Sequence, residues 1–326
     1  MSSAKGAGAA RELLELFEKM LLVRGAEERL SQLFADGEIP GFIHLSIGQE
    51  ATAVGVAAAL EDGDSLASNH RGHGHALAKG VDLDGFFLEL LGRDGGLCGG
   101  RGGSMHVAEM AVGMLGANGI VGGGVPIALG SALAHQVKAR KSVAVVFFGD
   151  GALAEGTVAE SMNMAALWDL PLLFVCENNG WAEFSPTDLQ LSTTPTRLAK
   201  AYGIATKEVD GNDVEAVAAA ARSLVGAMRR KPGPRLLECR TTRVQGHFEG
   251  DPQKYRDATE IEALPAKDPI GRCAKRLRAL KVAKRDIDAV AGRVDARIDA
   301  AVAKAKAADA PDFDAARADV YRAAAG

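Results

Sequence analysis

Apolar residues recur along this chain with helical spacing in some segments and as short uninterrupted runs in others. From about Ala10 to Ala35 they follow helical spacing, as in LLELFEKMLLVRGAEERLSQLF. Further helices are predicted over residues 49–60 and 83–91. Between the first two predicted helices, GEIPGFIHLSIG breaks the pattern with Gly and Pro. Helices are thus the elements that the pattern predicts for this part of the chain.

The part of the chain after residue 125 alternates between helical patterns and apolar runs. Strands are predicted over SVAVVFF, LPLLFVCEN, ATKEVD and RLLECRTT. Helices are predicted before and between them, over residues 126–139, 157–168, 196–203 and 214–230. Strands separated by helices imply a mostly parallel sheet that is covered by helices on both faces. The predicted fold class is therefore α/β.

We expect three segments and no linker that would split the chain. Residues 1–40 form an N-terminal helical extension, residues 41–265 the α/β domain, and residues 266–326 a C-terminal helical extension. The last of these is rich in Ala, Lys, Arg and Asp, which is typical of solvated helix faces or subunit contacts. No internal repeat is present in the sequence.

Composition narrows the classes of function. The 326 residues are 47% hydrophobic and carry a net charge of −4, which offers no general attraction to nucleic acid or to an anionic membrane. Four cysteines without metal-type spacing fit a reducing cytoplasm. No apolar run reaches membrane-spanning length. We expect a soluble cytoplasmic protein.

A glycine-rich stretch runs from Gly92 to Gly124 and reads GRDGGLCGGRGGSMH and later GMLGANGIVGGGV. Low complexity is the simplest interpretation of so many glycines. However, Met105, His106 and Met114, together with several aliphatic residues, argue against a disordered linker. The stretch is therefore expected to have a defined structure.

Two polar segments follow neighbouring predicted strands, FFGDGALAEG and CENNGW. Asp150 ends the first strand and Asn179 the second, so both side chains are expected at the same edge of a parallel sheet, where ligands bind. A carboxylate, an amide oxygen and a nearby main-chain carbonyl are ligands that Mg²⁺ accepts. Gly149 and Gly151 let a phosphate approach the main chain, and the next helix favours its charge. The pattern predicts a divalent-metal diphosphate site.

The motif GDG is followed, after twenty-six residues, by the motif NN. This pattern resembles the signature of thiamine-diphosphate enzymes. More narrowly, GDGALAEG and MNMAALWDLPLLFVCENNGW are similar to the α subunit of two-component E1 dehydrogenases, which act on pyruvate, branched-chain 2-oxo acids or acetoin. The other matching stretches are GFIHLSIGQEA, NHRGHGHALAKG, GGRGGSMH, ANGIVGGGVP and QGHFEGDPQKYR. Together they run from about Gly41 to Arg256, so the resemblance covers most of the chain.

The resemblance implies a role for each residue of the cofactor site. Asp150 and Asn179 would bind Mg²⁺ through their side chains, and Trp181 through its main-chain carbonyl, where many relatives have Tyr. The diphosphate would be bound by the main chain around the GDG turn, at Gly149, Gly151 and Ala152. Gly119 and Val121 match positions whose main chain contacts the aminopyrimidine ring.

The segment HRGHGH, residues 70–75, has two interpretations. A zinc cluster is disfavoured because no Cys or carboxylate group completes a tetrahedral set. The resemblance instead assigns Arg71 to the diphosphate, with His70 replacing the Tyr of pyruvate-type relatives. His73 matches a residue in or near the active-site channel. His44, in GFIHL, matches a residue at the active-site mouth, although a structural histidine is the alternative.

His247 is the leading catalytic candidate outside the metal site. It lies in QGHFEGDPQKYR, directly after a predicted strand, and the matching loop of the family covers the cofactor. Histidine exchanges protons near neutral pH, which suits the alkoxide and carbonyl oxygens that form during the reaction. An exposed loop histidine is the alternative. Phe248 replaces the serine that is phosphorylated in mammalian relatives, which excludes that modification here.

The resemblance implies an enzyme that needs a second chain. The glutamate that activates thiamine diphosphate belongs to the β subunit in this family, so we expect an α2β2 heterotetramer with cofactors at α/β interfaces. Acetoin would be cleaved to acetaldehyde and a hydroxyethyl–cofactor adduct, whose acetyl group passes to the lipoyl domain of a dihydrolipoyl acyltransferase (E2). Pyruvate or a branched-chain 2-oxo acid is the alternative substrate. A non-catalytic scaffold or regulatory paralogue is the alternative from another class.

Overall fold

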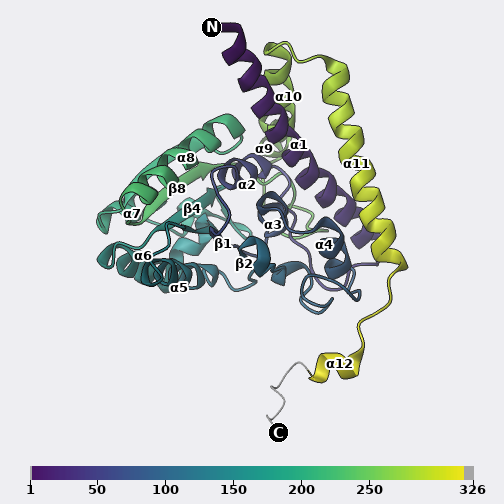
Figure 1. The fold of residues 1–326 in the computed structure, drawn as a ribbon, viewed down its shortest axis with the longest axis horizontal. Helices are drawn as coiled ribbons and strands as arrows, with labels where there is room; N and C mark the ends of the chain where they lie inside the picture. Colours follow the sequence, from purple (N-terminus) through teal and green to yellow (C-terminus); the bar gives the residue numbers. More distant parts are fainter. Residues whose placement is uncertain (1, 319–326) are drawn as a thin grey trace.

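The computed structural model describes residues 2–318, which are built around a six-stranded sheet (Figure 1). Its strand order is β2-β1-β3-β4-β8-β7, and every neighbouring pair is parallel. The sheet strands are β1 Ser65–Ala67, β2 Met114–Gly116, β3 Ala144–Gly149, β4 Leu172–Asn178, β7 Ala205–Asp210 and β8 Arg235–Arg240. A separate antiparallel pair consists of β5 Trp181–Ala182 and β6 Ser185–Pro186.

The α-helices connect and cover these strands. They are α1 Ser2–Ala35, α2 Glu50–Ala57, α3 His73–Lys79, α4 Leu83–Leu90, α5 Gly124–Val137, α6 Gly156–Leu167, α7 Pro195–Ala201, α8 Val214–Arg230, α9 Ala258–Ala263, α10 Pro269–Ala279, α11 Lys284–Ala307 and α12 Phe313–Ala318. Short 3₁₀ helices are η1 Ser104–His106, η2 Met110–Val112, η3 Asp150–Ala154, η4 Thr187–Leu189 and η5 Leu264–Lys267. Within residues 2–318, none of the helices combines the length and the apolar character that a membrane crossing requires.

The sheet is buried on both faces, which is why its central strands are apolar without interruption. Successive side chains of a strand point to opposite faces. Val145 and Phe147 of β3 accordingly pack in a core with α2 and α8, whereas Val146 and Phe148 pack in another core with α5 and α6. Figure 1 shows the two helix layers on either side of the strands. The predicted parallel sheet covered on both faces is confirmed.

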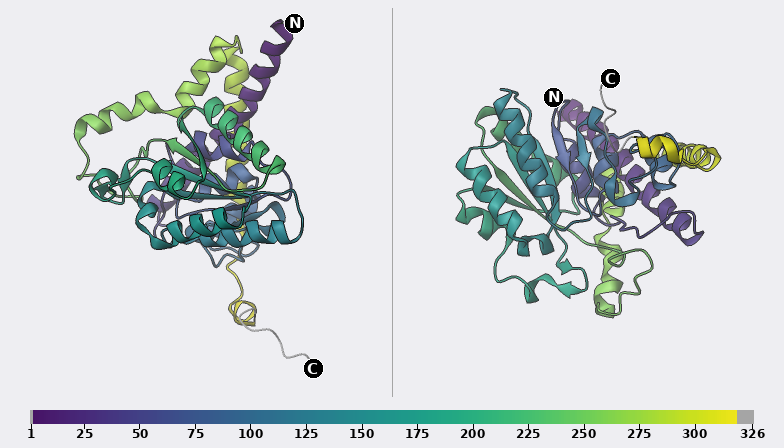
Figure 2. Two further views of the ribbon diagram at one scale, coloured as in Figure 1. Left: turned by 90° about the vertical axis from the view of Figure 1, so that its left-hand side faces the viewer. Right: turned by 90° about the horizontal axis from the view of Figure 1, so that it is seen from below.

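Helix α1 joins the α/β part of the molecule to the C-terminal helices. Leu16, Met20 and Val23 of α1 are buried in the same core as Ile298 and Val302 of α11. The two helices lie side by side in Figure 1, and α12 lies apart from the body in the left view of Figure 2.

The glycine-rich stretch is ordered around one buried carboxylate. Both oxygens of Glu89, in α4, accept hydrogen bonds from main-chain N–H groups, at distances of 2.6–3.0 Å. The donors are Cys98, Gly100, Gly102 and Gly103. Close approach of the main chain to a buried side chain requires residues without Cβ. The expectation of a defined structure for this stretch is therefore confirmed.

Several predicted elements have the observed bounds or nearly so. Helix α8 and strand β7 begin and end as predicted, β4 and β8 lie within the predicted runs, and β3 ends at Gly149, one residue beyond its predicted run. Strands β1 and β2 were not predicted because each has three residues, which is too few to show a periodic pattern. The first helix extends further toward the N-terminus than the pattern indicated, since it begins at Ser2.

Candidate functional site

Two polar residues meet at the carboxyl edge of the sheet, where β3 and β4 end. Asp150 follows β3 and Asn179 follows β4, and the main-chain N–H of Asn179 donates to Asp150 Oδ1 at 3.4 Å. The other oxygen of Asp150 accepts a short hydrogen bond from the Thr187 hydroxyl. Asn179 Nδ2 donates to Gln49 Oε1 at 3.1 Å, and Asn179 Oδ1 accepts from the Trp181 N–H at 3.1 Å. The two polar segments of the sequence are thus brought together.

The donor chemistry of this edge fits a divalent cation. Asp150 is fully buried, and burial raises its carboxyl pKa to about 6, although hydrogen bonds from Thr187 and the main chain oppose the shift. One carboxylate with amide and main-chain oxygens leaves positions for phosphate and water, as Mg²⁺ prefers. Glycine is required next to Asp150, since a Cβ at Gly151 would lie 2.8 Å from the Cβ of Ala182. The main chain of Gly151 therefore packs directly against Ala182, whereas a Cβ on Gly149 would have nothing within 4 Å, which leaves room for an anion at Gly149.

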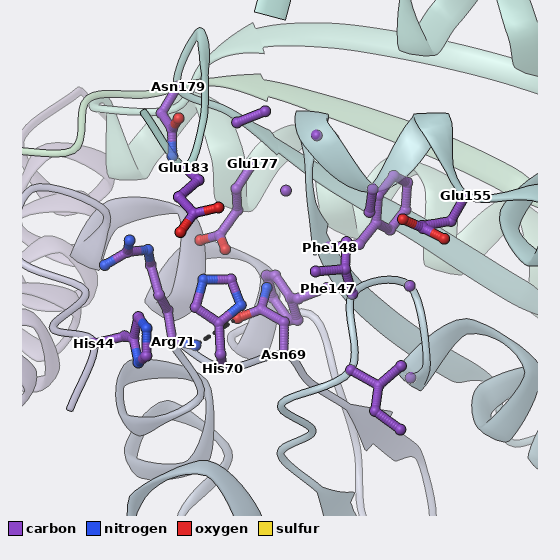
Figure 3. Close-up of a pocket in the computed structure, with 18 of the residues that line it drawn as sticks. His44, Asn69, His70, Arg71, Phe147, Phe148, Glu155, Glu177, Asn179 and Glu183 are labelled. Carbon is purple, nitrogen blue, oxygen red and sulfur yellow. Dashed lines mark hydrogen bonds between the residues drawn. The ribbon is translucent and has the colours of Figure 1, made fainter. Parts of the chain in front are cut away.

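A cavity of about 380 Å³ opens at this edge of the sheet (Figure 3). It brings together all but two of the site residues predicted from the sequence. Those that line it are His44, His70, Arg71, Gly119, Val121, Gly149, Gly151, Ala152, Asn179, Trp181 and His247. Of the other two, Asp150 is fully buried against Asn179, and His73 is buried with partners of its own.

Three histidines and two arginines share one side of the cavity. The ring centroids of His44 and His70 are 4.9 Å apart, those of His44 and His247 5.0 Å, and those of His70 and His247 5.5 Å. Burial, followed by the charge of Arg71, lowers the pKa of His44 to about 4 and that of His247 to about 3. The same causes hold the pKa of His70 well below its usual value. All three rings are neutral at pH 7.

Arg71 links the wall around residue 45 to the loop that carries His247. One of its terminal nitrogens donates to the Leu45 carbonyl at 2.8 Å, and the other donates to the His247 carbonyl at 2.6 Å. Figure 3 shows Arg71 beside His44 and His70. Burial and the nearby Arg243 lower the pKa of Arg71 to about 9, so its guanidinium group remains charged at neutral pH.

The loop around His247 is held by a small hydrogen-bond network. Asp251 Oδ2 accepts from the His247 N–H at 2.7 Å and from the Tyr255 hydroxyl at 2.6 Å. Asp251 Oδ1 accepts from the Gln253 N–H at 2.9 Å. Arg243 donates to the Tyr255 oxygen at 2.8 Å. The position of His247 therefore depends on the carboxylate of Asp251.

The indole of Trp181 packs against the end of the same loop. Its Nε1 donates to Glu260 at 3.1 Å, and its ring lies 5.3 Å from the Tyr255 ring. Arg256 lies over the indole at 5.8 Å and donates to Glu260 at 2.6 Å. Trp181 thus has a complete set of side-chain partners, so its difference from the Tyr of many relatives does not disturb the local packing.

Two histidines of HRGHGH do not line the cavity and are bonded in buried networks. His73 Nδ1 pairs with Glu27 at 2.9 Å, and its Nε2 pairs with the Ser104 hydroxyl at 2.8 Å. His75 stacks on Phe147 and bonds to Ser68 and Glu177. The histidines of this segment are therefore distributed among three separate environments.

Some cavity residues were not recognised in the sequence as site residues. Arg243 faces His247 from the segment after β8, and Glu177 projects into the cavity beside Arg71 (Figure 3). Each follows or ends a strand at the edge where Asp150 and Asn179 were expected, which is the signal that could have identified it. Gln49 carries no such signal, because its contact with Asn179 joins residues 130 positions apart.

Comparisons with known proteins point to one family. The family model for the dehydrogenase E1 component matches residues 18–314. The chain is 51% identical over 259 residues to the α subunit of an acetoin:2,6-dichlorophenolindophenol oxidoreductase of Bacillus subtilis, which covers 79% of this chain and 78% of the relative. The α subunit of the Cupriavidus necator oxidoreductase of the same name is 45% identical over 314 residues, or 95% and 94% of the two chains.

Pyruvate dehydrogenases are also similar. The pyruvate dehydrogenase E1 component subunit α of Zymomonas mobilis is 42% identical over 281 residues, which cover 85% of this chain and 79% of the relative. The matched range of the family model contains both polar strand ends, the histidine-rich side of the cavity and the loop around His247. The chain therefore belongs to the dehydrogenase E1 component family and is of its α-subunit type.

Proposed function

We propose that this chain is the α subunit of a two-component, thiamine-diphosphate-dependent dehydrogenase that acts on acetoin. Acetoin is cleaved to acetaldehyde, and the acetyl group is passed to the lipoyl group of a dihydrolipoyl acyltransferase, whose disulfide is reduced. Membership of the E1 family implies thiamine diphosphate. The likeness to acetoin oxidoreductase α subunits supports acetoin as the substrate.

One observation carries this proposal. Asp150 and Asn179 meet at a cavity that Arg71 and His247 also line, so that oxygen ligands suited to a metal and a cationic side chain lie at one site. A diphosphate with a bound cation needs both, because the metal and the guanidinium neutralise different oxygens. No plain nucleotide-binding loop of the G-x-x-x-x-G-K-[ST] type is present in the sequence to explain the site otherwise.

In this proposal Mg²⁺ is held by Asp150, by the side-chain oxygen of Asn179 and by the main-chain carbonyl of Trp181. The diphosphate lies against the main chain at Gly149, Gly151 and Ala152, and Arg71 and His70 donate to it. The aminopyrimidine ring lies against the main chain at Gly119 and Val121, where Met105 Sδ is already 3.5 Å from the position of a Cβ on Gly119. When bound, thiamine diphosphate supplies a carbon nucleophile and accepts the electrons of C–C cleavage.

The histidines of the cavity act as uncharged groups. His247 and His44 have low pKa values, which keep the rings neutral and able to accept a proton or a hydrogen bond from a substrate hydroxyl. Acetoin carries such a hydroxyl beside its carbonyl, and its cleavage requires that this proton be removed. We assign that step to His247, with His44 as its neighbour, whereas His73 acts indirectly.

The missing part of the site belongs to a partner. We propose a β subunit that supplies the carboxylate facing the aminopyrimidine ring, in an α2β2 heterotetramer. Apolar residues that a solitary chain would leave in water support this, because Ile120 and Val121 at the cavity and Ile127 and Val137 on α5 are 49–76% exposed. We further place the enzyme in the cytoplasm, because all four cysteines are free thiols.

A 2-oxo acid such as pyruvate is the second candidate substrate, and one observation favours it. Arg243 lines the cavity, and its buried Nε has no hydrogen-bond partner. A buried cationic donor without a partner is unfavourable, and the carboxylate of a 2-oxo acid would satisfy it. Acetoin has no charge to offer at this position. Substrate choice therefore depends on whether Arg243 is needed.

The test is to co-express the chain with a β subunit and to follow reduction of 2,6-dichlorophenolindophenol with Mg²⁺, thiamine diphosphate and acetoin, pyruvate or a branched-chain 2-oxo acid. Turnover with acetoin that Arg243→Gln lowers by no more than about tenfold, through the lost bond to Tyr255, is the expected result. If pyruvate is turned over instead and Arg243→Gln abolishes this activity, the substrate is a 2-oxo acid and not acetoin. Cofactor binding without turnover on any substrate, or no binding, would favour the non-catalytic scaffold.

A further inference from the structure

A fully buried carboxylate on the N-terminal helix has no place in the chemistry described above. Glu27 of α1 is 0% exposed. One of its oxygens accepts from both the main-chain N–H and the hydroxyl of Ser46, at 2.8 and 2.6 Å. The other oxygen pairs with His73 Nδ1 at 2.9 Å. A buried charge is costly unless it is paired and fully hydrogen-bonded, and both oxygens of Glu27 meet that condition.

The chain of contacts continues from His73 to the glycine-rich stretch. Glu27 is ionised, because His73 and Ser46 lower its pKa although burial alone would raise it. A carboxylate only accepts, so the proton between the two groups is on His73 Nδ1. Nε2 of the same ring meets the Ser104 hydroxyl at 2.8 Å. Four residues, Ser46, Glu27, His73 and Ser104, thus form one continuous buried relay.

Ser104, His73 and Glu27 are bonded in the same order as the serine, histidine and acid of a hydrolytic triad. Unlike the residues of such a triad, they do not face a substrate. Ser104 is only 7% exposed and does not line the cavity, so its hydroxyl is not presented to a substrate. His73 is fully buried and uses both ring nitrogens within the relay. These residues can act on the site only by placing other groups.

Each end of the relay adjoins a different wall of the cavity. Ser46 follows Leu45, whose carbonyl binds Arg71, and lies two residues after His44, which contacts His70 and His247. At the other end, Ser104 precedes Met105, which lines the cavity and faces Gly119. The cavity wall that carries His44 and the cavity wall that carries Met105 are therefore both linked to Glu27 by hydrogen bonds.

We propose that four residues act as positioning residues, namely Glu27, His73, Ser46 and Ser104. Through them, helix α1 holds in place the two cavity walls that carry His44 and Met105. The roles of those walls rest on the proposed function, whereas the fastening itself does not. The relay has two arms that meet at Glu27. Loss of hydrogen bonds from Ser46 should loosen the wall that carries His44, and loss of the bond to Ser104 should loosen the wall that carries Met105. A change of Glu27 should affect both walls.

The test compares Ser46→Ala, Ser104→Ala and Glu27→Gln with Glu28→Gln, which alters the exposed neighbouring carboxylate. Amide hydrogen exchange is measured segment by segment on the α/β complex. We expect exchange to rise severalfold over residues 42–47 in Ser46→Ala only, where the main-chain N–H of residue 46 still donates to Glu27, and roughly tenfold over 102–107 in Ser104→Ala only. In Glu27→Gln exchange should rise over both segments. Exchange that rises evenly over the whole chain, or in neither segment, would overturn the proposal.

Kinetics of the same complexes provide the second readout. Ser104→Ala should raise the half-saturating thiamine diphosphate concentration roughly tenfold with KM for acetoin unchanged, and Ser46→Ala should raise KM or lower kcat instead. Equal effects of the two serine variants on both constants would count against separate arms. If no variant or wild-type complex turns over acetoin while the exchange pattern is as expected, the relay is supported and the proposed function fails.

Discussion

Positive charge is concentrated on one side of the cavity, and it affects the protonation of the nearby histidines. Arg71 and Arg243 are close to the rings of His44, His70 and His247, and the positive charge of the arginines adds to burial in lowering the three pKa values. A neutral imidazole can accept a proton during the reaction, whereas an imidazolium cannot. An anion bound between the arginines would weaken their effect and make the rings more basic. An anionic cofactor bound between the arginines would therefore strengthen the bases that we propose.

The low pKa of His247 predicts how stability depends on pH. The ordinary value of 6.5 falls to about 3 in the folded chain, so between these pH values the unfolded chain binds a proton that the folded chain does not. Stability contributed at this position is then lost as the pH falls through that window. We expect the free energy of unfolding of His247→Gln, measured in urea, to improve relative to wild type as the pH falls from 7 to 4.

The same comparison with an exposed histidine serves as the control. His106 lies partly exposed on η1 and outside the cavity, so His106→Gln should show no such trend. A constant difference between His247→Gln and wild type at every pH would contradict a neutral His247 in the folded chain.

Asp251 predicts a second effect at the level of single residues. Its carboxylate accepts from the His247 N–H, the Tyr255 hydroxyl and the Gln253 N–H, so Asp251→Ala leaves the loop without its central acceptor. Misplacement of a catalytic group by about 1 Å costs on the order of 100-fold in rate. We expect kcat with acetoin to fall by roughly 10- to 100-fold, measured by dye reduction in the α/β complex.

A matched control lies at the end of the same loop. Asp257 is exposed and caps α9 by accepting from the Thr259 N–H, so Asp257→Ala removes a loop carboxylate without a bond to His247. Its kcat should stay within about twofold of wild type, with a small loss of stability from the missing helix cap. Equal losses of kcat in the two variants would mean that Asp251 has no particular role in placing His247.

At the scale of elements, the glycine-rich stretch is held to α4 mainly by the carboxylate of Glu89, beside one main-chain bond from Leu97 to Gly85. Glu89→Gln replaces one acceptor oxygen by an N–H₂ group, which would face two main-chain donors, those of Cys98 and Gly100 or those of Gly102 and Gly103. Buried donors left without an acceptor cost roughly 1–3 kcal/mol each, so we expect the free energy of unfolding to fall by about 2–4 kcal/mol. Denaturant unfolding measures this.

The control for this variant is an exposed carboxylate that accepts one main-chain bond. Glu109 receives the Asp82 N–H at 2.9 Å, and Glu109→Gln should cost less than about 1 kcal/mol. A loss in Glu89→Gln no larger than in this control would show that the stretch does not depend on Glu89.

The spacing of apolar residues predicted most of the central elements but not their arrangement. Strand β7 and helix α8 could be read from local pattern alone, and the polar ends of β3 and β4 placed Asp150 and Asn179 at one edge. By contrast, β1 and β2 are too short to show a period, and they occupy one side of the sheet.

Contacts between residues distant in sequence leave no local pattern. Glu27 and His73 are 46 positions apart, and His73 and Ser104 are 31 apart, so nothing in either segment indicates their hydrogen bonds. His73 could be identified only as one of several histidines in HRGHGH. Its separation from His70, three residues earlier, follows from α3, which begins at His73 and directs the side chain toward α1.

At the scale of the whole molecule, an apolar face runs along α5, whose first residues Gly124 and Val125 line the cavity. Ile127, Leu133 and Val137 are exposed on α5, and Leu167 and Trp168 are exposed at the end of the neighbouring helix α6. Gly130, between the first two, has open space around the position of a Cβ, so another backbone could approach closely there. Such a face is typical of a subunit interface, which agrees with an enzyme whose site requires a second chain.

Assembly can be tested by charging this face without touching the core. Ile127→Arg, at a side chain that is 49% exposed, should change the free energy of unfolding of the isolated chain by less than about 0.5 kcal/mol. It should nevertheless abolish co-purification with the β subunit, because an unpaired charge buried in an interface costs several kcal/mol. Light scattering after size exclusion gives the mass. Ala219→Arg, on the exposed side of α8, is the control and should leave a heterotetramer. A heterotetramer in both variants would move the interface away from α5 and leave its apolar face for another partner, whereas loss of assembly in Ile127→Arg alone would place the β subunit beside the cavity that it is proposed to complete.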